Sequence, residues 1–119
     1  MRERITKVLR QQLELVPEDV RARILLATNL AFSKEDKEET IRHLQTAVAL
    51  RPGDPNTLYN AACTYGLLSE KTTTLETLKK AFAAGYSNKD WAAQDTDLDC
   101  LHDEPEFQRL VGLKETSAS

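Results

Sequence analysis

Cysteine, glycine, proline and aromatic residues are all scarce in this chain of 119 residues. The two cysteines, Cys63 and Cys100, are too few for a disulfide framework and lack the spacing of metal ligands. We therefore expect both to be reduced thiols. The four glycines are isolated from one another, which excludes a glycine-rich loop of the kind that cradles phosphate groups.

Long apolar runs are missing as well. No segment approaches the ~18 consecutive apolar residues that cross a bilayer, and the first residues, Met1 to Arg4, do not lead into the apolar core of a secretory signal. We therefore expect a cytoplasmic protein that does not enter a membrane. Its length and its composition, 40% hydrophobic and 29% charged, are typical of one ordinary globular domain.

The whole chain has a net charge of −3, and positive charge is not concentrated in any part of it. Residues 1–51 hold ten lysines and arginines against eight acids, whereas residues 52–119 hold six against eleven. Six acids fall in one stretch without a lysine or arginine: Asp95, Asp97, Asp99, Asp103, Glu104 and Glu106. A nucleic-acid-binding protein gathers positive charge on one face, so we do not expect nucleic acid as a partner.

Apolar residues recur at helical spacing through most of the sequence. The pattern predicts five helices, over residues 2–15, 19–32, 37–50, 55–68 and 73–84. No segment of useful length shows the strict alternation of a strand. The fold class that we expect is therefore all-α.

Start and stop signals mark several of these helices. Pro17 ends the first helix, and Pro52 follows the third. Asp54 is a good N-cap, and Pro55 fits the first helical position because its missing N–H would be unpaired there. Gly85 stands where the end of a helix favours a left-handed residue.

The helices are arranged as two similar pairs. Pro17 and Pro52 are 35 residues apart, and residues 20–52 align with residues 55–86 if the first unit has one extra residue in its turn. Small residues recur where two antiparallel helices must approach closely: Ala27, Ala47, Ala62 and Ala81.

This pattern resembles the tetratricopeptide repeat (TPR) family. Residues 54–65 (DPNTLYNAACTY) are similar to the first helix of such a repeat, and residues 75–82 (LETLKKAF) are similar to the second. The chain departs from the family pattern at Ser33 and Ser69, where glycine is common, and at Thr40 and Thr74, where alanine is usual. The resemblance implies an antiparallel helix-pair solenoid of about two full repeats.

The C-terminal part resembles the segment that closes bacterial TPR arrays, from Gly85-Tyr86 through Leu110. The end of a solenoid exposes an apolar face, which a short atypical element covers. The resemblance implies that five residues pack there: Trp91, Leu98, Leu101, Phe107 and Leu110. It also implies a regulatory or scaffolding role, because such arrays are often appended to serine/threonine kinases, nucleotide cyclases or other signalling proteins.

The expected organisation is one domain over residues 1–115. It comprises a leading helix (2–15), a first repeat (19–50), a second repeat (55–84) and a capping segment (88–112). We expect residues 116–119 to form a disordered tail.

The first helix of each pair lines the concave surface of such a solenoid. The resemblance and the helical spacing place nine residues there: Arg21, Ile24, Thr28, Phe32, Asn56, Tyr59, Asn60, Cys63 and Leu67. We expect a groove that binds a protein or peptide partner, with Tyr59 as an aromatic anchor and Arg21 as a cation at one end. Alternatively, the terminal segment or a second copy covers part of this face. Of the family's clamp for the carboxylates of chaperone tails, only Asn60 is matched, which argues against such an adaptor.

The leading helix carries an apolar stripe that no preceding repeat covers: Ile5, Val8, Leu9 and Leu13. A short solenoid can bury such a face by self-association. The alternative function is therefore a structural assembly unit, present as a homodimer.

The sequence offers no clear catalytic or metal-binding arrangement. The Asp95–Asp99 run follows the spacing of a calcium loop, but Cys100 stands where that loop needs glycine, and helix caps and turns explain these acids more simply. Cys100 and His102 lack a third group to orient them. His43 has polar neighbours on its helix, so we expect it at the surface. We expect no enzyme activity, no cofactor and no metal.

Overall fold

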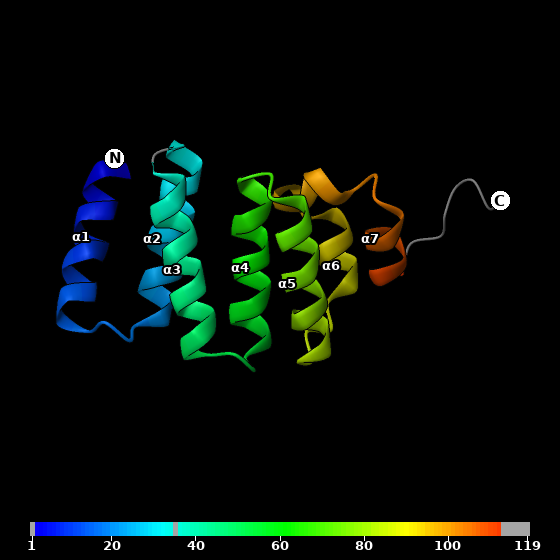
Figure 1. The fold of residues 1–119 in the computed structure, drawn as a ribbon, viewed down its shortest axis with the longest axis horizontal. Helices are drawn as coiled ribbons and strands as arrows, with labels where there is room; N and C mark the ends of the chain where they lie inside the picture. Colours follow the sequence, from blue (N-terminus) through cyan, green and yellow to red (C-terminus); the bar gives the residue numbers. More distant parts are fainter. Residues whose placement is uncertain (1, 35, 113–119) are drawn as a thin grey trace.

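The computed structural model describes residues 2–34 and 36–112, which form helices and turns without a strand (Figure 1). The expected all-α class is confirmed. The helices are α1 (Arg2–Leu15), α2 (Val20–Ser33), α3 (Lys37–Leu50), α4 (Pro55–Leu67), α5 (Lys71–Ala83), α6 (Lys89–Gln94), the 3₁₀ helix η1 (Thr96–Leu101) and α7 (Pro105–Leu110). Residues 113–115 of the expected domain and the expected tail (116–119) lie outside the described residues.

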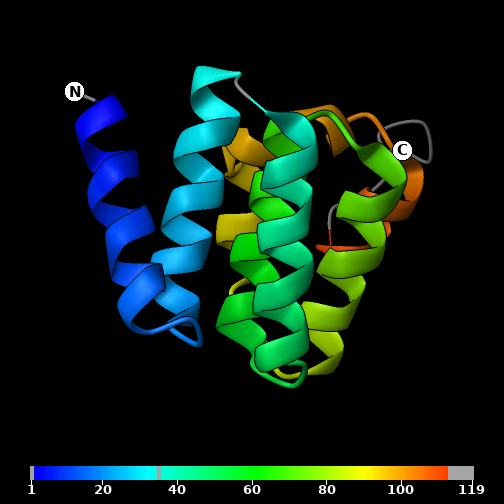
Figure 2. The same ribbon diagram turned by 60° about the vertical axis from the view of Figure 1, so that its left-hand side comes forward.

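Helices α1 to α5 stand side by side along the long axis of a molecule measuring 53 × 27 × 20 Å (Figure 1). They alternate in direction because a short turn joins each to the next. Helix α2 contacts α1, α3 and α4, and α4 contacts α5 and η1. Helix α6 lies on the side of α2 and α4 that faces away from α3 (Figure 2). Every helix among the described residues is too short or too polar to cross a bilayer.

Aspartates begin the first three helices that follow α1. Asp19, Asp36 and Asp54 have extended backbones, and each side chain accepts a hydrogen bond from the backbone N–H three residues further on. At the other end of a helix, Gly85 follows α5 with φ of 117°, a conformation that costs glycine little. The start and stop signals at Asp54 and Gly85 are therefore confirmed.

Residues at equivalent positions of the two helix pairs are buried to the same extent. Thr40 and Thr74 are both fully buried, and each hydroxyl donates to the carbonyl oxygen four residues earlier. Lys34 and Ser69, with φ of 55° and 59°, each occupy the left-handed region after the first helix of a pair. The expected close contacts at small residues are confirmed, because all four are fully buried: Ala27, Ala47, Ala62 and Ala81.

The C-terminal elements pack on α4 and α5. Leu98, Leu101 and Phe107 are buried as expected, and Leu110 packs against the same cluster. The expectation that Trp91 packs with them is wrong, because its side chain is 55% exposed. Its neighbour Ala92 is the fully buried residue of α6, and adjacent residues of a helix point in different directions.

His43 belongs to a polar network that joins α1, α2 and α3. Its Nδ1 lies 3.1 Å from the guanidinium of Arg23, and its Nε2 lies 3.2 Å from the carboxylate of Glu39, which also pairs with Arg10. The expectation that His43 lies at the surface is wrong, since its side chain is only 16% exposed. This burial lowers the pKa of His43, although Glu39 opposes the shift.

Gly66 marks a very close approach between α4 and η1. A β-carbon at this position would lie 2.3 Å from the carbonyl oxygen of Asp97, which is backbone and cannot move aside cheaply. We predict that Gly66→Ala lowers the free energy of unfolding by about 1–3 kcal/mol, as overpacking does, in a chemical denaturation measured by circular dichroism. Gly53→Ala is the control and should be close to neutral, because its β-carbon would meet nothing within 4 Å. Equal stability of the two variants would contradict this packing.

Candidate functional site

A groove runs between α2 and α4 as two connected hollows. The first, of about 650 Å³, lies at the start of both helices and is lined by Glu18, Asp19, Val20, Arg21, Ile24, Leu25, Arg51, Asp54, Asn56, Thr57 and Asn60. The second, of about 340 Å³, is closed on a third side by the α6–η1 junction and is lined by Ile24, Leu25, Thr28, Tyr59, Asn60, Cys63, Thr64, Trp91, Asp95 and Asp97. We call the second the acidic hollow. Ile24, Leu25 and Asn60 line both hollows, which makes them one continuous groove.

Most of the residues expected on this face line the groove. Seven of the nine do so: Arg21, Ile24, Thr28, Asn56, Tyr59, Asn60 and Cys63. Phe32, which is 49% exposed, and Leu67, which is half-buried, are not among the lining residues. A hydrogen bond of 3.0 Å between the hydroxyls of Thr28 and Thr64 joins the two helices across the acidic hollow.

Two exposed amides project from α4. Asn56 and Asn60 are one helical turn apart and therefore share a face. Neither side-chain amide forms a hydrogen bond with any residue that the structure describes. An amide both donates and accepts hydrogen bonds, so this pair is suited to the backbone of an extended peptide.

Tyr59 is part of the core rather than of an accessible surface. It is 5% exposed, its ring stacks on that of Tyr86 at 4.1 Å, and its hydroxyl donates to Asp95 Oδ2 at 2.7 Å. Burial, followed by the contact with Asp95, raises the pKa of Tyr59. The expectation of an exposed aromatic anchor is wrong here, because the terminal segment covers this part of the face.

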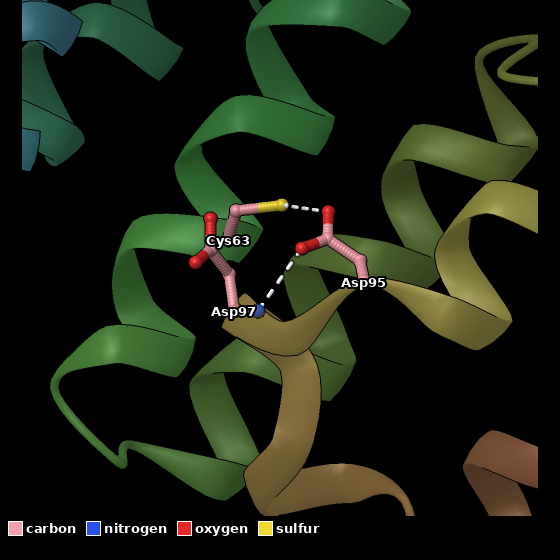
Figure 3. Close-up of side chains that lie close together, drawn as sticks. All are labelled: Cys63, Asp95 and Asp97. Atoms are coloured by element: carbon pink, nitrogen blue, oxygen red, sulfur yellow. Dashed lines mark hydrogen bonds between the residues drawn. The ribbon is translucent and has the colours of Figure 1, made fainter.

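Hydrogen bonds to Asp95 attach the terminal segment to α4. Besides the hydroxyl of Tyr59, its carboxylate accepts hydrogen bonds from the thiol of Cys63, at 3.4 Å, and from the backbone N–H of Asp97, at 3.0 Å (Figure 3). A carboxylate has room for several donors. Asp95 is therefore well satisfied although it lies only partly in solvent.

Cys63, Asp95 and Asp97 each place one potential metal-ligand atom within 4.8 Å of the others. Metal binding requires the thiolate form of cysteine. Burial and the charge of Asp95 instead raise the pKa of Cys63, so the thiol stays protonated and donates to Asp95. The chemistry of the three groups fits a hydrogen-bond network better than a metal centre.

Asp97 differs from Asp95 in lacking partners. No described residue donates a hydrogen bond to its carboxylate, whose oxygens carry no dashed line in Figure 3. The carboxylate is half-buried. Burial, followed by the nearby charges of Asp95 and Asp99, raises the pKa of Asp97.

Leu25, Trp91 and Asp97 are groove residues that the sequence did not predict. Leu25, on α2, is 47% exposed and Trp91, on α6, is 55% exposed, and both line the acidic hollow. The apolar stripe of α2 includes Leu25, and nothing in the local sequence separates it from its buried neighbours. The position of Asp97 depends on how η1 packs, which no local pattern indicates.

The stripe on α1 is divided between two environments. Ile5 and Val8 are 45% and 56% exposed, whereas Leu9 and Leu13 are half-buried on a helix that packs against α2. Leu15, on the exposed side, is 80% exposed. Part of the expected self-association surface is therefore accessible.

No family model matches the chain, and neither a curated protein nor a solved structure matches it. The function is therefore argued from the groove itself.

Removing the hydroxyl of Tyr59 tests how much its hydrogen bond to Asp95 contributes to holding the terminal segment on α4. We predict that Tyr59→Phe lowers the free energy of unfolding by about 1.5–3 kcal/mol, because the lost hydrogen bond has a charged acceptor. Urea denaturation followed by circular dichroism would measure the loss. Tyr65→Phe is the matched control, since Tyr65 is also a buried residue but its hydroxyl forms no hydrogen bond with a described residue. A Tyr59→Phe variant no less stable than this control would show that the bond to Asp95 contributes nothing.

Proposed function

We propose that this chain is a TPR-like protein-interaction module that binds an extended segment of a partner protein in the groove between α2 and α4. The observation that supports the proposal best is the continuity of the two hollows through Ile24, Leu25 and Asn60. A continuous groove accepts several residues of a peptide in succession, whereas a closed cavity accepts a compact ligand.

The chemistry of the groove is that of a peptide-binding surface. Leu25 and Trp91 offer exposed apolar area, and such contacts supply much of the binding free energy of a peptide. Asn56 and Asn60 offer amides for its backbone. Arg21, also exposed, stands at the start of α2 among charges of both signs, where it can orient the segment.

The repeated helix pairs favour the same proposal. Thr40 and Thr74, Leu44 and Leu78, and Ala47 and Ala81 are buried pairs of residues at a constant separation along the chain. Repeats of this kind create extended binding surfaces. As a TPR-like module closed by a capping segment, the chain would be a regulatory or scaffolding part of a bacterial signalling protein in the cytoplasm.

The proposal assigns no catalytic step and no cofactor to the groove. A nucleophilic cysteine needs a lowered pKa and an adjacent base. The thiol of Cys63 has a raised pKa and donates a hydrogen bond to Asp95, so it is held in the protonated, unreactive form. Binding is therefore the role that these side chains support.

Leu25→Asn is the variant that tests the groove. Ile24 and Tyr59 are buried, so replacing them would disturb packing, whereas Leu25 is accessible. Short peptides selected from a displayed random library against the natural chain should bind Leu25→Asn at least about tenfold more weakly, because a neutral polar amide would be desolvated in the apolar contact. Fluorescence polarisation with the selected peptides measures this change.

Leu50→Asn is the matched control for that experiment. Leu50 is similarly exposed, at 41%, but lies at the end of α3 outside the groove. It should leave the affinity unchanged. Equal weakening by both variants, or a library that yields no binding peptide, would count against the groove as a binding site.

Self-association through α1 is a second candidate, supported by the accessible apolar residues Ile5, Val8 and Leu15. An unpartnered face at the end of a short helical array is a natural contact between two copies. In this function the chain would be a structural assembly unit.

Light scattering coupled to size-exclusion chromatography separates the two candidates. If α1 is a dimer interface, the mass of the natural chain should double as concentration increases, and Val8→Glu should remain monomeric because a charge would be buried in the contact. Leu50→Glu should still dimerise. A natural chain that stays monomeric at every concentration would exclude the assembly unit and leave the groove proposal unaffected.

A further inference from the structure

The acidic hollow indicates which kind of side chain the bound segment should carry. Resting on the proposed function, we infer that the hollow takes the side chain of a lysine or arginine of the partner, with Asp97 as the counter-ion and Trp91 and Leu25 as the walls.

Charge differs between the two ends of the groove. In the first hollow, Arg21 and Arg51 offset Glu18, Asp19 and Asp54. The acidic hollow is lined by Asp95 and Asp97 and by no lysine or arginine among the described residues. A cationic side chain is therefore complementary to this end of the groove and has no such preference for the other.

Asp97 is the group that remains available to a ligand. Asp95 already accepts three hydrogen bonds, from Tyr59, Cys63 and Asp97 itself. The carboxylate of Asp97 accepts none from the described residues and is half-buried beside that second charge. Partial burial of this charged carboxylate is unfavourable, and a bound cation would offset that cost in free energy. Burial raises the pKa of Asp97 for the same reason.

The walls of the hollow suit the rest of a lysine or arginine side chain. Trp91, from α6, and Leu25, from α2, expose apolar area in the same hollow as the carboxylates. The methylene groups of a long basic side chain pack against apolar surface while the charged end reaches a polar group. The face of an indole also attracts the cation itself, and arginine is the more frequent partner.

An organic cation fits these groups better than a metal ion. A metal ion would have to displace the thiol proton of Cys63 and the hydrogen bonds of Asp95. A guanidinium or ammonium group needs only one free carboxylate beside an apolar wall. Of the two acids that line the hollow, Asp97 is the one whose carboxylate accepts no hydrogen bond from a described residue, and it supplies that carboxylate.

The test uses short random peptides displayed as a library and selected separately against the natural chain and against Asp97→Asn. Peptides selected on the natural chain should carry a lysine or arginine at one fixed position. Replacing that residue by its neutral counterpart, citrulline for arginine or norleucine for lysine, should weaken binding at least about tenfold. Asp97→Asn should lose the selection for the basic residue and bind both peptides equally. Asp99→Asn is the matched control, because Asp99 is equally charged but exposed and outside the hollow, and it should retain the preference.

The outcomes of this experiment separate the basic-residue requirement from the proposal that the groove binds a peptide. Thermal unfolding of Asp97→Asn at or above the temperature of the natural chain would show that the lost preference does not come from a damaged fold. Peptides that lose affinity with Leu25→Asn but show no enrichment of basic residues would overturn the basic-residue requirement and leave the groove proposal unaffected. The same result would follow if the neutral peptide bound the natural chain as tightly as the basic one. A library that yields no binding peptide would overturn both.

Discussion

The hydrogen bonds to Asp95 are the interaction on which the shape of the groove depends. One carboxylate joins the hydroxyl of Tyr59, the thiol of Cys63 and the backbone of Asp97, and so connects the terminal segment to the middle of α4. Gly66 makes this attachment possible, because any β-carbon there would collide with the backbone of η1. Hydrogen bonds to a charged acceptor in a partly buried setting are among the stronger ones in proteins.

This attachment both covers and shapes the groove. It buries Tyr59 and Cys63, which lie along the inside of the acidic hollow. In exchange it adds a third wall, from the α6–η1 junction, and brings Trp91 and Asp97 next to residues of α2. The groove is thus open at its first hollow and bounded on three sides at its second. An extended segment would meet a mixed charge pattern at one end and an acidic, apolar environment at the other.

Two surfaces of the described residues carry several polar or apolar groups without partners. In the interior, buried threonines such as Thr40 and Thr74 bond to backbone carbonyls and small residues allow close packing. Along the groove, by contrast, one carboxylate, two amides and two large apolar side chains lack partners among the described residues. The outer side of α1 is the other such surface. Features of this kind cost stability and are expected where a protein meets something else.

The sequence by itself determined the all-α class, five helices to within about two residues, the caps at Asp54 and Gly85, and the small residues at the helix contacts. These depend on local periodicity and on the chemistry of neighbouring residues. Seven of the nine residues predicted for the groove do line it, because the face of a helix follows from spacing. The burial of Tyr59 and His43, the exposure of Trp91 and the vacant hydrogen-bonding positions of Asp97 were decided only by tertiary structure. Each depends on which distant segment covers a given face, and the short C-terminal helices carry too little periodicity to reveal where they pack.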